Sequence, residues 1–146
     1  MSKMTDCVAI EQFTFAGNAT FTISSRKTDA RFTYKVSKAK DKDTLWFVAL
    51  LTGPDNDSDY TYLGVVRDRF GGRAFQLTKK SRFSEDVACV KAFQFFMKKI
   101  MENTELPECL EFRHEGHCGK CGRTLTVPES IDRGIGPECW SKMGGM

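Results

Sequence analysis

The chain has 146 residues and an ordinary hydrophobic content of 40%, enough for one main folded domain with a small appendage. Its first residues lack the apolar core of a secretory signal, and its longest apolar run, residues 45–51, is too short to cross a membrane. We therefore expect a cytoplasmic protein without a membrane partner. The formal net charge of +3 does not by itself indicate a class of partner.

The first half of the chain is predicted to form short antiparallel strands. Apolar and polar residues alternate in several segments, and glycine-rich or charged turns separate them. The expected strands lie at residues 12–15, 20–24, 32–36, 45–51, 60–66 and 74–78. The short connections favour an antiparallel meander of about five strands.

A long amphipathic helix is predicted at residues 85–102. Apolar residues recur every three or four positions from Val87 to Ile100, and Ser84 is a preferred residue for the N-terminal cap. A helix with one apolar side packs on a sheet with one apolar face. The predicted fold class is therefore α+β, with an antiparallel sheet of about five strands packed by one long helix.

The C-terminal segment is predicted to form a separate metal-binding module. Pro107 is expected to end the unit of sheet and helix, and a short strand at residues 110–113 leads into a cysteine-rich segment. We expect a sheet and helix domain at residues 1–108 and a small treble-clef-like zinc module at residues 109–146.

Three cysteines of this module indicate a zinc site. Cys118 and Cys121 are separated by two residues, so one tight turn can direct both thiolates at one ion. A loop can return Cys139 to the same ion, and Gly136-Pro137 is expected to cap and begin a short helix there. In a reducing cytosol, clustered cysteines favour metal binding over a disulfide.

The fourth zinc ligand is predicted to be a histidine. His114 is preferred, because His117 is adjacent to Cys118 and adjacent residues rarely bind one ion together. His117 is the alternative, and Cys109 is the third candidate. Three thiolates and one imidazole form a closed ligand set, which favours a structural Zn²⁺ over a catalytic one.

Residues 118–139 resemble a family of small zinc-domain proteins, many of them from phages and prophages. The matching pattern is C-x2-C-G-R-x-L-T-x-P-x-S-I-x2-G-I-G-P-x-C. The resemblance implies zinc binding and a phage or prophage setting, which would place the protein in the cytoplasm of a bacterial host. It implies no reaction. Within the pattern, Arg123 and Thr126 are expected to support the metal site through hydrogen bonds.

No catalytic pattern stands out, so we expect a non-enzymatic protein without a small-molecule substrate. A zinc deaminase would place His-x-Glu ahead of Pro-Cys-x-x-Cys. Here Pro137-Glu138-Cys139 lacks the second cysteine of that pattern. The sequence also lacks a recognisable phosphate-binding loop and a paired carboxylate set.

A basic stretch at residues 67–83 indicates a possible binding surface. It contains six basic side chains and one acidic side chain, so the positive excess of the chain arises there. The basic residues are Arg67, Arg69, Arg73, Lys79, Lys80 and Arg82. Phenylalanines lie between these cations, a combination that suits single-stranded nucleic acid. The alternative for this stretch is that the phenylalanines face the core and the cations form a solvated edge. The alternative function for the chain is a protein-binding phage factor that inhibits a host defence or transcription component.

Overall fold

The computed structural model describes residues 2–4, 6–40, 44–53, 59–69, 72–102, 109–114, 116–125 and 128–142. The elements are β1 (Ser2–Met4), α1 (Cys7–Thr14), β2 (Asn18–Ser25), β3 (Arg31–Lys38), β4 (Leu45–Leu51), β5 (Tyr60–Arg69), β6 (Gly72–Gln76), α2 (Ala88–Met101), β7 (Leu110–His114), α3 (Pro128–Arg133) and α4 (Pro137–Lys142). Pro107 and Thr126, to which the sequence assigned roles, lie outside the described residues. No helix in the described ranges has the length and apolar character needed to cross a membrane.

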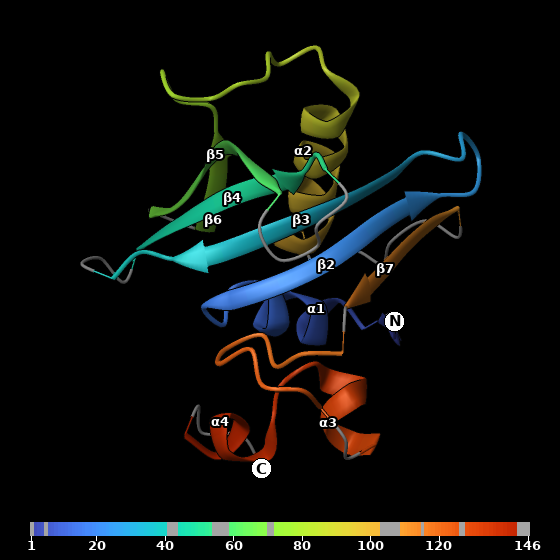
Figure 1. Ribbon diagram of the computed structural model, residues 1–146, viewed down its shortest axis with the longest axis vertical. Helices are drawn as coiled ribbons and strands as arrows, with labels where there is room; N and C mark the ends of the chain where they lie inside the picture. The colour runs from blue at the N-terminus through green and yellow to red at the C-terminus, as the bar shows by residue number, and fades with distance from the viewer. Residues whose placement is uncertain are drawn as a thin grey trace.

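One antiparallel sheet contains seven strands in the order β1-β7-β2-β3-β4-β5-β6. The predicted α+β class with an antiparallel sheet is confirmed, but the sheet is larger than the expected meander. The two added strands come from opposite ends of the chain. β7 pairs with β2 on one side (Figure 1) and with β1 on the other. Although the sequence assigned β7 to the metal module, its main chain is thus hydrogen-bonded within the sheet.

The predicted strand at residues 12–15 is wrong, because α1 occupies this part of the chain. The side chain of Asp6 accepts a hydrogen bond from the Val8 amide and caps the helix. Ile10 and Phe13 are fully buried and lie three positions apart, on one side of the helix. The short alternation of Phe13 with Phe15 resembles a strand only because Phe15 follows the helix directly.

Helix α2 begins three residues later than the sequence indicated. Val87 is its N-terminal cap residue and provides no capping side chain. Ser84, the predicted cap, instead accepts a main-chain hydrogen bond from the Val87 amide in the preceding turn. The buried face of α2 agrees with the predicted periodicity and consists of Cys89, Val90, Phe93, Phe96, Met97 and Ile100.

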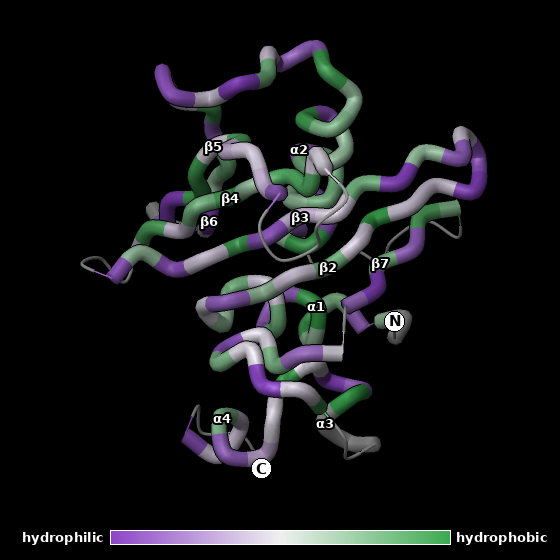
Figure 2. Tube along the Cα trace, viewed as in Figure 1, coloured by the Kyte–Doolittle hydropathy of each residue, from purple (hydrophilic) through white to green (hydrophobic). Residues whose placement is uncertain are grey.

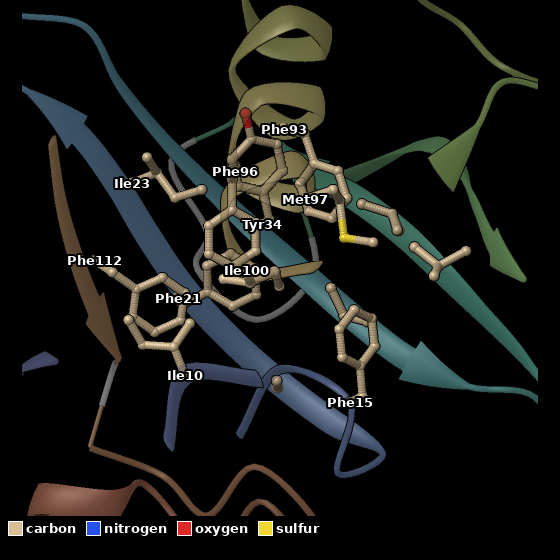
Figure 3. Packing of buried hydrophobic residues seen from close by; sticks show 14 of the residues in the cluster. Ile10, Phe15, Phe21, Ile23, Tyr34, Phe93, Phe96, Met97, Ile100 and Phe112 are labelled. Atoms are coloured by element: carbon tan, nitrogen blue, oxygen red, sulfur yellow. The ribbon is translucent and has the colours of Figure 1, made fainter. Parts of the chain in front are cut away.

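Both long helices pack against the same face of the sheet and share one core. Aromatic rings dominate this core: Phe21 stacks on Phe112 with ring centroids 4.7 Å apart, and Phe96 stacks on Phe112 at 5.4 Å (Figure 3). The hydroxyl of Tyr34 donates to the Cys89 carbonyl at 2.6 Å, and burial raises the pKa of that hydroxyl. α1 therefore covers the sheet together with α2, and the packing does not depend on a single helix.

No helix of the described residues covers the opposite face of the sheet, which is polar on β2 and β3 and apolar on β4. In β3, Tyr34 and Val36 are buried in the core, whereas Thr33, Lys35 and Ser37 point to this second face. In β4 the same alternation leaves the Phe47 side chain 44% exposed. Figure 2 shows hydrophobic and hydrophilic residues mixed along β3, in contrast to the largely hydrophobic β4. We call the uncovered surface the open face.

Candidate metal centre and basic surface

A tight hairpin at residues 116–125 presents the first two cysteines. The Cys118 amide donates to the Arg123 carbonyl at 2.8 Å, and the Gly122 amide donates to the Cys118 carbonyl at 2.9 Å. Gly122 has a φ of 78°, in the left-handed region that favours glycine. The hairpin thus turns the Cys118 and Cys121 side chains to the same side, as the spacing of two residues predicted.

The third cysteine lies in a short helix that begins where the sequence predicted. α4 starts at Pro137, and the Trp140 amide donates to the Gly136 carbonyl at 2.9 Å. Cys139 and Trp140 pack with a small hydrophobic cluster built on Cys118, Leu125 and Ile135. Trp140 is thus a packing residue of this module.

The Sγ atoms of Cys118, Cys121 and Cys139 all lie within 4.8 Å of one another. Thiolates at about 2.3 Å from a tetrahedral zinc ion would be roughly 3.8 Å apart, so the three sulfurs fit one ion after a small adjustment. Amides point at the most buried sulfur: Gly136 donates to Cys118 Sγ at 3.3 Å and Lys120 donates to it at 3.4 Å. Donors of this kind stabilise a thiolate ligand.

The thiols of this cluster differ in acidity. Burial raises the pKa of Cys118, but hydrogen bonds from the amides of Gly136, Cys121 and Lys120 outweigh burial and lower it to about 7. For Cys139, burial and the neighbouring Cys121 and Cys118 sulfurs raise the pKa to about 11. Of these two thiols Cys118 is therefore the more acidic, and a bound cation would favour the thiolate form of its cysteine ligands.

His114 lies apart from the three cysteines, in contrast to the ligand set that the spacing suggested. The group of described residues whose ligand atoms come together contains Cys118, Cys121 and Cys139. His114 is fully buried at the end of β7; its Nε2 lies 2.5 Å from the Ile131 oxygen, and its Nδ1 accepts from the Gly116 amide at 2.9 Å. Both ring nitrogens thus bind the main chain of the module.

The two alternative ligands do not join this group either, within the part of the chain that the structure describes. His117 is exposed, and its main chain forms an isolated bridge with Thr124 in the hairpin. Cys109 lies ahead of β7, where its carbonyl accepts from the Arg26 amide at 2.7 Å. Arg123, expected to support the cysteines, instead has a largely exposed side chain 4.0 Å from a Glu138 carboxylate oxygen.

The metal module packs tightly on α1. A Cβ atom at Gly119 would lie 2.7 Å from the Phe13 ring, and one at Gly134 would overlap the same ring. The Asn18 amide at the start of β2 donates to the Gly119 carbonyl at 2.6 Å. Together with His114, these contacts connect the cysteine hairpin to the main core. In Figure 1 the module accordingly lies next to α1.

The basic stretch does not form one continuous surface. Arg73 lies on the core side, where its guanidinium stacks over Phe15 and Trp46 at 4.6 and 5.2 Å from the ring centroids. It also donates to Glu11 at 2.7 Å. Arg67 is half-buried on β5, and its Nε has no acceptor among the described residues. The side chain of Arg69 lies outside the described set.

The remaining three cations form a cluster beside an aromatic residue that the sequence reasoning did not select. Lys79, Lys80 and Arg82 are exposed and line an open hollow of about 530 Å³ together with Tyr62 and Ser81. We call this surface the basic hollow. A compact turn shapes it, because the Thr78 amide donates to Ser81 Oγ at 2.8 Å.

The phenylalanines expected beside these cations belong to the core instead. The Phe75 ring centroid lies 4.8 Å from that of Phe93 on α2, and Phe83 packs against the same core. For Phe75 and Phe83, the structure therefore agrees with the interpretation that the phenylalanines face the core. The alternation of Tyr60 and Tyr62 in β5 was the available signal for aromatic residues on the open face.

In comparisons with known proteins, the match falls in the C-terminal segment of the chain. No curated protein and no solved structure matches the chain. Residues 110–144, which span β7 and the metal module, match a family of unknown function (DUF6011).

Proposed function

We propose that this chain is a non-enzymatic, nucleic-acid-associated protein in which Cys118, Cys121 and Cys139 hold a structural Zn²⁺. The observation that carries the nucleic-acid part is the basic hollow, where Lys79, Lys80 and Arg82 adjoin the Tyr62 ring. Clustered, exposed cations of this kind neutralise phosphates and displace their counterions.

A structural role for the metal is supported by its surroundings. Cys118 is fully buried, and the hairpin that contains it contacts Phe13 and Asn18 of the main domain. Closure of the hairpin by a metal would therefore fix the module against α1. Thiolates suit zinc, and thiolate-rich sites are typical of structural rather than catalytic zinc.

The setting follows from the same proposal. The resemblance of residues 118–139 to phage and prophage proteins favours a cytoplasmic role in an infected bacterium. An alternative partner, a host protein, is favoured by one observation: the Phe47 side chain is 44% exposed on the open face. Nucleic acid is preferred, because the cations outnumber the exposed large apolar residues on this side of the sheet.

Two measurements on the purified full chain test this proposal. Elemental analysis is expected to give one zinc per chain, and anisotropy with a fluorescent 20-nucleotide oligo-dT is expected to show binding that weakens steeply with salt. A protein that binds no nucleic acid in 20 mM salt would exclude the nucleic-acid part. A folded protein purified without metal, and unable to take up zinc, would exclude the structural metal.

Charge variants locate the surface. In the triple variant Lys79→Gln, Lys80→Gln, Arg82→Gln, the slope of log affinity against log salt is expected to become shallower by about 2, because each phosphate contact with a single strand contributes about 0.7. Lys98→Gln with Lys99→Gln, on α2, is the matched control and is expected to leave the slope unchanged. Equal losses in both variants would indicate a diffuse attraction rather than a site.

A further inference from the structure

We propose that Tyr60 and Tyr62 form a base-stacking platform on the open face, beside the basic hollow. This inference deepens the proposed function and rests on it: the hollow would bind phosphates, and the two tyrosines would make the site specific for unpaired bases. The occupant is single-stranded nucleic acid, whose bases offer the rings that duplex DNA keeps stacked inside.

The position of Tyr62 joins the two parts of the surface. Its ring borders the basic hollow, and its hydroxyl lies 3.0 Å from Thr78 Oγ1, in the turn that bears Lys79 and Lys80. This hydrogen bond holds the turn against the strand. A base on the Tyr62 ring would therefore have its phosphates within reach of the cations.

Tyr60 extends the platform along β5. It lies two residues before Tyr62 and so points to the same face of the sheet. The two residues are about 6.8 Å apart along the strand, twice the rise of roughly 3.4 Å per nucleotide in a stacked strand. Two bases of an extended strand can each contact one ring at this spacing.

Tyr62 has a small cross-strand neighbour, and Tyr60 has a charged neighbour. Ala49 is the cross-strand partner of Tyr62, and its methyl group is too short to cover the ring. Lys35 Nζ lies 5.6 Å from the centroid of the Tyr60 ring. A cation at that distance can contact a phosphate next to a stacked base.

Outside the basic hollow, the open face also carries charges that are complementary to a polyanion. Across β2 and β7, one acidic side chain, Glu111, is bound by two cations, Arg26 and Arg113. This triad keeps one net positive charge. A single strand that leaves the platform across the sheet would thus meet no uncompensated carboxylate at this point, which favours nucleic acid over a basic protein segment.

The experiment compares binding to an oligonucleotide that has all its bases with binding to one that lacks its central bases. The full chain, loaded with zinc, is titrated into fluorescent 20-nucleotide oligo-dT and into an oligomer of equal length whose central nucleotides are abasic. We expect the abasic oligomer to bind wild-type protein roughly tenfold more weakly, since stacking on an aromatic ring contributes about that factor per base. Tyr62→Ala and Tyr60→Ala are each expected to weaken oligo-dT binding similarly and to reduce the penalty for the abasic oligomer.

Tyr62→Phe is the matched control. It keeps the ring and removes the hydroxyl that contacts Thr78, so it is expected to bind oligo-dT more tightly than Tyr62→Ala and to keep the penalty for the abasic oligomer. Thermal unfolding of each variant shows whether a loss of affinity reflects a loss of fold. If Tyr62→Ala unfolds, Tyr60→Ala and the comparison of oligo-dT with abasic oligomer in wild-type protein still decide the question.

The outcomes separate this inference from the proposed function. Equal binding of oligo-dT and the abasic oligomer by wild-type protein would overturn the stacking platform and leave the basic hollow as a phosphate site. The stacking platform would also be overturned if the variants of Lys79, Lys80 and Arg82 lost affinity for oligo-dT while Tyr60→Ala and Tyr62→Ala kept it. No binding of either oligomer by wild-type protein would overturn both, and would turn attention to a protein partner.

Discussion

The Nε2 atom of His114 lies 2.5 Å from the main-chain oxygen of Ile131, so the last residue of β7 is bound to helix α3. Nδ1 of the same ring accepts from the Gly116 amide. With one nitrogen donating and the other accepting, the imidazole is neutral, with its proton on Nε2. His114 is thus a link between the sheet and the metal module.

His114→Ala is expected to lower the free energy of unfolding by about 3 kcal/mol, because it leaves two main-chain groups without partners and creates a cavity beside Phe13. Zinc content per folded chain is expected to stay at the wild-type value. Chemical denaturation and elemental analysis measure the two quantities.

Cys118→Ser is the comparison for this variant and is expected to lose the metal. The ligand set suggested by the spacing predicts the opposite for His114, namely a folded His114→Ala protein without zinc. That result, with His117→Ala retaining its zinc, would establish His114 as the fourth ligand.

Gly119→Ala is expected to destabilise the protein by about 1–3 kcal/mol, because its methyl group would lie 2.7 Å from the ring of Phe13. Gly136→Ala is the matched control. There the nearest atoms, on Leu125 and Cys118, would be 3.8 Å away or farther, which is ordinary contact. If thermal unfolding showed equal effects for both variants, the tight packing of the module on α1 would be refuted.

Arg73→Gln is expected to lower the free energy of unfolding by about 1–2 kcal/mol, because it removes the contacts with Phe15 and Trp46 and the ion pair with Glu11. Its affinity for oligo-dT is expected to stay unchanged. Lys80→Gln, in the basic hollow, should do the reverse, with nearly unchanged stability and weaker binding. Weakened binding in Arg73→Gln at full stability would contradict this division of the basic stretch.

Glu111 is expected to contribute to the loss of stability in acid. Hydrogen bonds from Arg26 and then Arg113 lower the pKa of its carboxyl group from 4.5 to about 2. A carboxyl group whose pKa is lower in the folded state stabilises that state above its unfolded pKa. This contribution is present above pH 4.5 and is lost as the pH falls toward 2.

Glu111→Gln is therefore expected to flatten the decline of the unfolding free energy between pH 4.5 and 2, relative to wild type. Urea denaturation across this range measures the slope. Parallel curves for the two proteins would show that the ion pairs of Glu111 do not contribute to folding.

The sequence alone predicted features that depend on local spacing. The periodicity of apolar residues located the buried face of α2, alternation located β2, β3 and β5, and a continuous apolar run located β4. The interval between Cys118 and Cys121 and the Gly136-Pro137 pair predicted a turn and a helix start that bring three sulfurs together. These patterns are informative because residues a few positions apart have relative positions that the local backbone conformation already sets.

Only the tertiary structure decided relations between distant segments. Pairing of β7 with β2 and β1 joins the two ends of the chain, and no local pattern encodes that pairing. It placed His114 in the buried interior, with its ring nitrogens at the main chain of Ile131 and Gly116. At the other edge of the sheet, β6 pairs with β5 and its Arg73 contacts Phe15 and Glu11 on the core side, whereas Lys79 and Lys80 follow in the turn that lines the basic hollow. The sequence thus determined which residues carry the chemistry, and the packing of the sheet determined which of them meet.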